Sequence, residues 1–421
     1  MFAVLVVSFF LFKSSSAYVP SYLYNPSWST PSSSSGKTQG GKPTYQDAMP
    51  LGNGALTALA WANVTNGGAG LYIGHQQAMS SHTELFKLAA IQISLSPNPY
   101  AAGSYFNQTI DFATGTVSIM LGGTSMQTAS ALLSIWVDAN SDALFVDVSS
   151  PSGQTFSLSA TVKSVRPSVP TSYTPAFGFC SPVHTQPDVF VDPVPSQIRL
   201  HAPRAQTPEE EVFHASGYMR PTRVLSQQNR LPMIGSFQPG SVIIYHRNDD
   251  SDGLTVNMTL SQQGIPQLIA TTPDWWRDNQ FGFVLDGGAG PQLVRTSPSV
   301  LTSSSPASSF QLRFTVLVVQ TDTPEDWLAD LSARVSTSLP SPKAASDAWW
   351  LSFWSRSWIV VNETQTSGNG FAISRMVAIT RYTQAVQSRG TIIPIKFNGM
   401  AFIAAMEDGE FQADGRDWGP R

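Results

Sequence analysis

Short apolar runs that alternate with polar residues recur along most of this chain, and this pattern limits its fold more than any other feature. The period of two, the β-branched residues and the Gly, Pro, Asn and Asp residues at the boundaries predict antiparallel strands. Strands at such short spacing indicate a mainly β protein, with one large antiparallel β-sandwich over residues 45–322. The runs cover residues 55–61, 71–73, 88–95, 115–121, 131–137, 144–148, 241–246, 254–260, 281–285 and 310–319.

Two stretches lack this alternation. Residues 18–44 contain the sequence SSSSGKTQGGKP, which is typical of a flexible segment. Residues 166–240 are rich in proline and weakly periodic, which predicts long loops that cover the sheets.

The apolar period changes from two to that of a helix at Thr323. This residue is a candidate N-cap, followed by Pro324 and two acidic residues, and we expect a helical linker over residues 323–342. Two further helices are predicted, at residues 343–359 and 371–389. Their aromatic-rich faces need partners, so residues 343–421 are interpreted as the start of a second, helical architecture that is truncated.

Composition excludes some functional classes. The 24 basic and 28 acidic residues give a net charge of -4, which leaves no surplus of positive charge for a phosphate backbone, so nucleic acid is not an expected partner. Charged residues make up only 12% of the chain. The polar residues are mostly neutral, which is typical of proteins that meet neutral ligands such as glycans.

The N-terminus indicates export. Residues 2–12 form an apolar run of the length of a secretory h-region, and small residues follow as far as Ala17. We interpret residues 1–17 as a signal peptide, with a membrane anchor as the alternative, and expect a secreted, extracellular protein without a membrane association after cleavage. Cys180 is the only cysteine, so an intramolecular disulfide is excluded. Four N-x-[ST] sequons predict glycosylation, at Asn63, Asn107, Asn257 and Asn362.

No motif for a metal or a cofactor is found. None of the six histidines lies in an HxxxH or HxH arrangement, and the chain has no G-x-S-x-G motif, no P-loop and no dinucleotide-binding fingerprint. We therefore expect neither a metal site nor a cofactor.

Three segments carry more polar and aromatic groups than packing requires. They are residues 49–54, which include Asn53-Gly54; residues 72–79, which include His75; and residues 389–399, which include Lys396 and Asn398. Each has a plainer interpretation, as a hairpin turn, a polar loop and a structural loop respectively. In the third segment, however, ammonium, amide and aromatic groups lie together, and sugar sites use such groups.

At these segments the chain resembles the family of domain of unknown function 5703, a relative of the glycoside hydrolase family 95 α-L-fucosidases. The resemblance implies an N-terminal β-sandwich, a helical linker and an (α/α)6 barrel that holds the catalytic site. The matching residues are PLGNG at 50–54, the stretch from Gly70 to Tyr100, FWSRSWI at 353–359, RYTQAVQSRGTIIPIKFNG at 381–399 and DGRDWG at 414–419.

The resemblance also assigns candidate binding residues. Lys396 and Asn398 match a sugar-pocket loop, Asp417 and Trp418 match a loop near it, and Asn53 and His75 match sandwich loops next to the barrel. Inverting enzymes of family 95 use a Glu general acid and an activated water, and the positions that carry them lie beyond the residues matched here. No catalytic residue is therefore assigned.

Three functions follow as hypotheses. The first is a secreted glycoside-hydrolase-like protein, related to fucosidases and inactive in this form. The alternative is a non-catalytic carbohydrate-binding or structural β-sandwich protein. A secreted adhesion or cell-wall protein without a sugar pocket is a third possibility.

Overall fold

The structure is a computed structural model of the 421-residue chain. It describes residues 23–31, 38–39, 42–43, 47–79, 85–166, 188–191, 237, 240–248, 254–274, 276–288, 291–337, 343–361, 367–390, 392 and 399–402. The predicted signal peptide and most of the flexible N-terminal segment and of the proline-rich stretch lie outside these residues.

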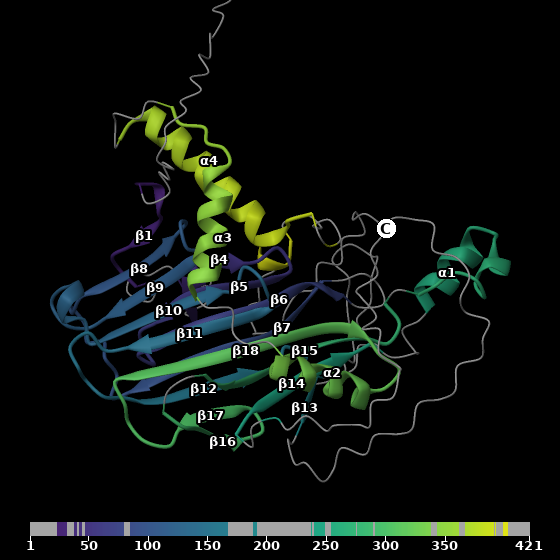
Figure 1. Cartoon of the computed structure of the whole chain (residues 1–421), viewed down its shortest axis with the longest axis horizontal. Helices are drawn as coiled ribbons and strands as arrows, with labels where there is room; N and C mark the ends of the chain where they lie inside the picture. Colours follow the sequence, from purple (N-terminus) through teal and green to yellow (C-terminus); the bar gives the residue numbers. More distant parts are fainter. Residues whose placement is uncertain are drawn as a thin grey trace, which may run out of the picture.

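Two large antiparallel sheets make up the centre of the molecule (Figure 1). The nine-stranded sheet has the order β1-β8-β9-β10-β11-β18-β15-β14-β13, and the seven-stranded sheet has the order β16-β17-β12-β7-β6-β5-β4. The first sheet comprises β1 Ser27–Trp28, β8 Phe106–Asp111, β9 Thr116–Leu121, β10 Ala131–Val137, β11 Ala143–Ser149, β18 Ser309–Gln320, β15 Asn279–Gly287, β14 Val242–Arg247 and β13 Val189–Val191. The second comprises β16 Leu293–Ser297, β17 Val300–Ser303, β12 Ser157–Lys163, β7 Leu85–Ser96, β6 Gly68–Met79, β5 Leu56–Asn63 and β4 Met49–Gly52. A short pair, β2 Thr38–Gln39 and β3 Lys42–Pro43, is separate.

The inner faces of the two sheets share one core. Ile91 and Ile93 of β7 are buried in the same apolar cluster as Leu133 and Ile135 of β10. Alternate residues along these strands point inward, which is the arrangement of a sandwich. The prediction of a mainly β fold is confirmed.

The helices are α1 Leu254–Gln262, α2 Pro324–Thr337, α3 Lys343–Ser355 and α4 Asn369–Gln387, with short 3-10 turns η4 Met126–Thr128, η7 Pro266–Leu268 and η8 Met400–Phe402. In Figure 1, α3 and α4 project from one end of the sheets, while α1 lies apart from them. No helix among the described residues is long and apolar enough to span a membrane.

One strand prediction is wrong. Residues 254–260 were expected to be a strand, but they form α1. A helix makes its hydrogen bonds within the segment, so the run needs no partner strand. Its end is closed locally, since Ile265 N donates to Leu260 O at 2.9 Å. Several strands were also missed, among them β8, β12 and β13, the last of which lies within the stretch expected to be irregular.

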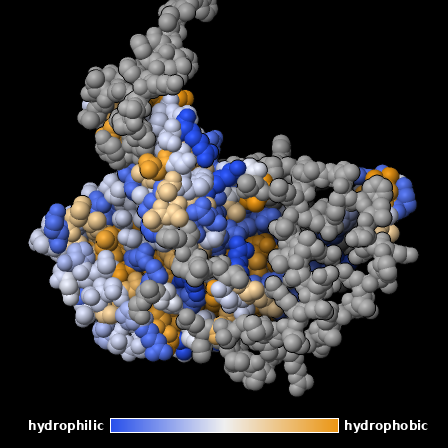
Figure 2. Space-filling view, viewed as in Figure 1, coloured by the Kyte–Doolittle hydropathy of each residue, from blue (hydrophilic) through white to orange (hydrophobic). Residues whose placement is uncertain are grey.

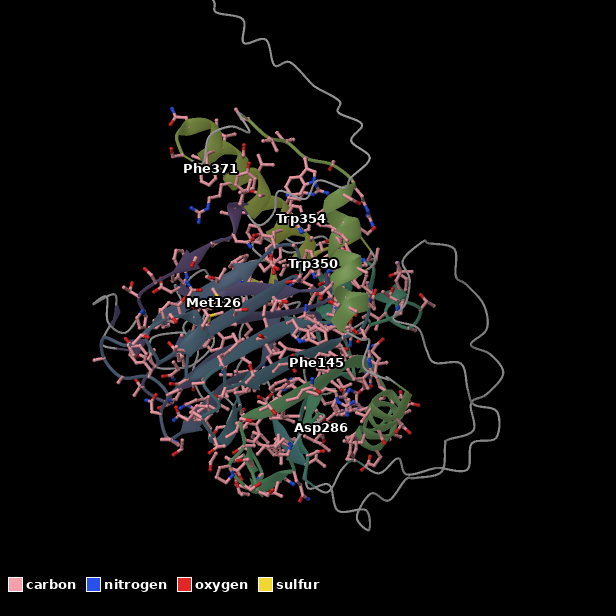
Figure 3. The ribbon with its side chains drawn as sticks, turned by 60° about the vertical axis from the view of Figure 1, so that its left-hand side comes forward. Met126, Phe145, Asp286, Trp350, Trp354 and Phe371 are labelled. Carbon is pink, nitrogen blue, oxygen red and sulfur yellow. The ribbon has the colours of Figure 1, made fainter. Side chains whose placement is uncertain are left out.

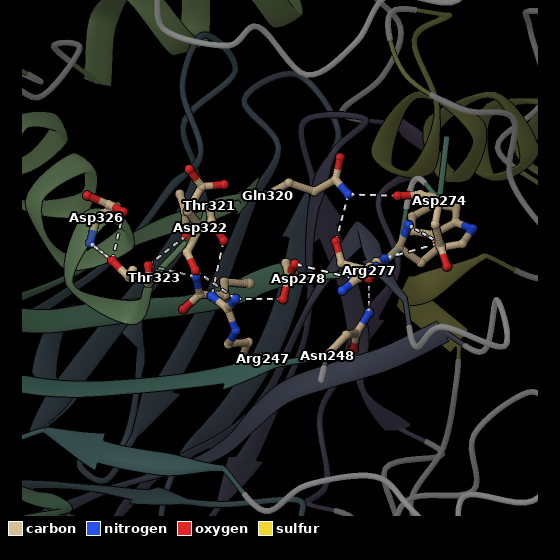
Figure 4. A network of polar contacts seen from close by, with 12 residues as sticks. Arg247, Asn248, Asp274, Arg277, Asp278, Gln320, Thr321, Asp322, Thr323 and Asp326 are labelled. Carbon is tan, nitrogen blue, oxygen red and sulfur yellow. Dashed lines mark hydrogen bonds and ion pairs between the residues drawn. The ribbon is translucent and has the colours of Figure 1, made fainter. Parts of the chain in front are cut away.

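The predicted start of α2 is confirmed, and a polar network joins it to the first sheet (Figure 4). Thr323 Oγ1 accepts from Asp326 N at 3.1 Å and donates to Asp326 Oδ2 at 2.7 Å, which caps the helix. Arg247 of β14 donates to Asp278 Oδ1 at 2.6 Å and to the carbonyls of Thr321 and Asp322 at 3.1 and 3.0 Å. These bonds hold the end of β18 in the position from which α2 begins.

α3 and α4 insert large side chains into the sandwich core. Trp350 and Trp354 of α3 are buried in the same cluster as the strands, and Figure 3 labels them beside α3. Trp354 Nε1 donates to Phe112 O, and Tyr382 OH of α4 donates to Pro50 O at 3.0 Å. The two helices are therefore anchored to the sandwich by both aromatic packing and hydrogen bonds.

The opposite side of these helices exposes apolar side chains. In the space-filling view, orange surface lies beside blue on the projection that α3 and α4 form (Figure 2). The exposed residues include Leu351, Ile373, Met376 and Ile379.

Candidate functional site at the junction of the sandwich and the helices

The PLGNG segment forms the turn between β4 and β5, where the sandwich meets α4. Asn53 Oδ1 accepts from the backbone N–H of Leu56 at 2.8 Å, and Asn53 Nδ2 donates to Asp142 Oδ1 at 3.3 Å and to backbone carbonyls of the β10–β11 loop. Gly54 N donates to Val386 O at 2.9 Å, and Gly54 has a φ of 92°. Asn53 therefore fixes the shape of the turn, and Gly54 of this turn is hydrogen-bonded to the end of α4.

His75 lies on β6 beside the same loop and is 2% exposed. Its Nδ1 accepts from Gln77 N at 3.2 Å, and its Nε2 lies 3.7 Å from Asp142 Oδ2. Arg334 of α2 donates to the same carboxylate oxygen at 2.9 Å. Asp142 thus joins three elements, and the structure brings the two predicted sandwich residues, Asn53 and His75, together around it.

The electrostatics of this cluster favour an ionised Asp142. Burial by itself raises the pKa of this carboxyl group, but the interaction with His75, the charge of Arg334 and the hydrogen bond from Asn53 together hold the pKa well below its ordinary value. Such a carboxylate stays negatively charged and keeps its hydrogen-bonding partners in position, and it does not donate a proton near neutral pH.

Arg389 follows α4 and contacts both the sandwich and α3 at this junction. Its guanidinium donates to Ala139 O at 2.9 Å and to Gly52 O at 3.3 Å, and it lies 3.4 Å from the ring centroid of Trp349. Burial lowers the pKa of Arg389. The planar guanidinium therefore connects both sheets to α3 and α4 at one point.

Lys87 of β7 anchors the segment that follows. Its side chain is fully buried, and Nζ donates to Met400 O and, at 3.2 Å, to Ala401 O of η8. Gln76 Oε1 accepts from Met400 N at 3.4 Å. Gly74 packs so closely on η8 that a Cβ there would lie 2.3 Å from Met400 Cγ. The 3-10 turn is thus seated on the sandwich.

These contacts fix both ends of residues 390–398. Gln387 and Gly399 are also in close contact, and a Cβ on Gly399 would lie only 2.0 Å from Gln387 Oε1. The φ of Gly399 is 71°, in the region that favours glycine. The predicted residues Lys396 and Asn398 belong to the interval between these ends but lie outside the described residues. Asp417 and Trp418 also lie outside them.

Arg389 and Lys87 were not identified as site residues from the sequence. Arg389 ended a predicted helix and Lys87 preceded a predicted strand, and neither position shows which distant backbone it contacts. One signal was available: Lys87 is flanked by Phe86 and Leu88, and a lysine within an apolar strand indicates a buried partner.

The other predicted sites have mixed positions. Asn63 and Asn107 are half-buried at strand positions, Asn257 is exposed on α1, and Asn362 lies outside the described residues. Thr109 Oγ1 donates to Asn107 Oδ1 at 2.6 Å within one sequon. Among the described residues, no group of three or more His, Cys, Asp and Glu side chains is placed to hold a metal ion.

A family profile for the domain of unknown function DUF5703 matches residues 37–178 and 183–359, which is most of the chain. This chain belongs to the DUF5703 family. The matched residues include the PLGNG turn, His75, Lys87 and α3. No curated protein matches the chain.

Among solved structures, the chain is similar to "Putative kojibiose phosphorylase from human microbiome", with 10% identity and a TM-score of 0.37. The similarity covers 86% of this chain and 39% of that structure, so the chain spans well under half of its length.

Proposed function

We propose that this DUF5703 chain binds a neutral carbohydrate at the junction of the sandwich and the helices, as part of a secreted glycoside-hydrolase-like protein of the fucosidase-related, inverting type. The observation that carries the proposal is the anchoring of residues 390–398 at both ends, by Arg389 and by η8. Binding residues are commonly found on loops that a rigid scaffold holds in place.

The residues within this interval suit a sugar. Lys396 supplies an ammonium donor and Asn398 an amide that both donates and accepts, while Phe397 supplies an aromatic face. Asp417 and Trp418 are proposed as further contacts. Asn53 and His75 are given a positioning role, because their hydrogen bonds are directed at the protein itself.

The junction supports binding better than proton transfer. Inversion needs a carboxylic acid and a carboxylate on opposite faces of the sugar. Asp142 is held ionised, and Asp138 is fully buried and accepts from Ser141 Oγ at 2.6 Å. We therefore expect no hydrolysis by this chain alone, which also favours the second candidate function, a non-catalytic carbohydrate-binding protein.

Titration of the chain with methyl glycosides of L-fucose, D-galactose, D-glucose and D-mannose, followed by saturation-transfer NMR, tests the proposal. We expect at least one sugar to bind, and Lys396→Ala and Asn398→Ala to abolish its signal. Gln262→Ala, at an exposed amide side chain of α1, is the matched control and should bind as the wild type does.

If none of the four glycosides binds, or if both variants bind like the control, the junction is not a sugar site. Release of nitrophenol from 4-nitrophenyl α-L-fucoside is measured in parallel. Turnover above that of buffer would contradict the expected lack of catalysis.

A further inference from the structure

The outer face of the seven-stranded sheet carries an ordered set of aromatic and hydroxyl side chains. Along β7, Ile91 and Ile93 point into the core while Gln92 and Ser94 alternate with them and are half-buried. The same alternation on β6 and β12 places Tyr72 and Thr161 on this outer face.

Cross-strand register places these residues in rows. Thr161 pairs with Gln92, Gln92 with Gly70, and Gly70 with Trp61, so one row crosses β12, β7, β6 and β5. A second row runs parallel to it, in which Ser159 pairs with Ser94. The five side chains of these rows and their aromatic neighbour Tyr72 are called the outer platform, which consists of Trp61, Tyr72, Gln92, Ser94, Ser159 and Thr161.

The aromatic end of the outer platform is held in place. A Cβ on Gly70 would lie 2.3 Å from Cε2 of Trp61, so the indole ring rests directly on the glycine backbone. The Trp61 and Tyr72 ring centroids are 4.8 Å apart at an interplanar angle of 57°. Such packing restricts both rings, and a ring that is already fixed loses little entropy when it binds a ligand.

The polar part of the outer platform is neutral and has unused hydrogen-bonding capacity. Neither row contains an acid or a base, and the exposed Lys163 lies only at one margin. The described part of the chain supplies no hydrogen bond to the side chains of Gln92, Ser94, Ser159 or Thr161. Donors and acceptors without charge, beside a fixed aromatic face, match the hydroxyls and the apolar ring face of a sugar.

We propose that the outer platform binds a chain of neutral polysaccharide. The rows extend over four strands about 4.8 Å apart, which provides room for more than one sugar residue. The site is separate from the junction, although Tyr72 lies two residues from Gly74, on which η8 is seated. The bound polymer would therefore lie near η8, and the proposal does not depend on the function proposed for residues 390–398.

Affinity gel electrophoresis tests this site with protein made in a bacterial host, so that no glycan on Asn63, two residues beyond Trp61, contributes to the contact with the polymer. The gels contain xyloglucan, mixed-linkage β-glucan or hydroxyethyl cellulose. We expect retardation in at least one of them. Trp61→Ala, and Thr161→Arg in the middle of the rows, should each weaken the affinity about tenfold or more.

The matched control is Trp28→Ala, which removes a 39% exposed tryptophan from the other sheet and should migrate as the wild type does. Circular dichroism checks that each variant is folded, and if Trp61→Ala unfolds, Thr161→Arg decides. The proposal is overturned if the wild type is not retarded in any gel, if both platform variants keep their affinity, or if anionic polygalacturonate retards the protein equally.

Discussion

At the scale of single residues, Lys87 makes the sharpest prediction. Burial lowers its pKa from 10.5 to about 7, so between these values the unfolded chain binds more protons than the folded chain. Stability must then rise with pH across this window, by up to about 1.4 kcal/mol per pH unit from this group. Lys87→Met keeps the apolar part of the side chain and removes the titrating group. The unfolding free energy of the wild type should therefore increase relative to that of Lys87→Met as the pH rises from 7 to 10.

Urea denaturation at intervals of one pH unit measures this difference, and subtraction of the two profiles cancels the other titrating groups. Lys163→Met, at an exposed position, should run parallel to the wild type. Parallel profiles for Lys87→Met as well would mean that Lys87 is charged in the folded protein near neutral pH.

Residues such as Lys87 and Arg389 also show where prediction from sequence ends. Asn53 and His75 lie in local motifs. Asn53 lies in a turn, as expected, whereas His75 lies within β6 and not in the expected loop. The partners of Lys87 and Arg389 are backbone carbonyls that are far away in sequence, for example Met400 O and Ala139 O. Side-chain type does not encode such partners; only the closed fold brings them together.

At the scale of elements, the contact of α3 with the β8–β9 hairpin is testable at Gly115. Its φ is 61°, and a Cβ there would lie 2.4 Å from Trp350 Nε1. Gly115→Ala should therefore cost about 1 kcal/mol for the backbone and a further 1–3 kcal/mol, roughly, for displacement of the tryptophan.

Gly103→Ala is the matched control, because Gly103 has a φ of 83° with no atom within 4 Å of a built Cβ. It should show the backbone cost alone in thermal unfolding. Equal losses of stability in the two variants would argue against tight packing of α3 on the hairpin.

Elements were predictable where the pattern in the sequence and the local chemistry agree. The strands at β5, β10 and β18 alternate clearly, and α2 has both a capping residue and an apolar face. α1 failed because its apolar residues also alternate with polar ones, so period two and helix could not be separated over nine residues. β13 was missed because three residues carry too little pattern.

At the scale of the whole molecule, the helices and the sandwich share one apolar core. Trp350, Trp354, Tyr382 and Val386 belong to the same buried cluster as the strands. We expect α3, α4 and the sheets to unfold in one transition, so tryptophan fluorescence and far-ultraviolet circular dichroism should give the same midpoint in guanidinium chloride. An earlier fluorescence transition would mean that the helices detach first.

The contact between Gln387 and Gly399 has a consequence for the design of variants. Arg389 and η8, on either side of residues 390–398, are held by their own hydrogen bonds to the sandwich. Lengthening this interval should therefore lower the free energy of unfolding mainly by the entropy of closing a longer segment, about 0.6 kcal/mol for each doubling of its length. We therefore expect this interval to tolerate replacement by other sequences. Foreign peptides placed there should be displayed on an unchanged scaffold, and libraries of such inserts offer a route to new specificities.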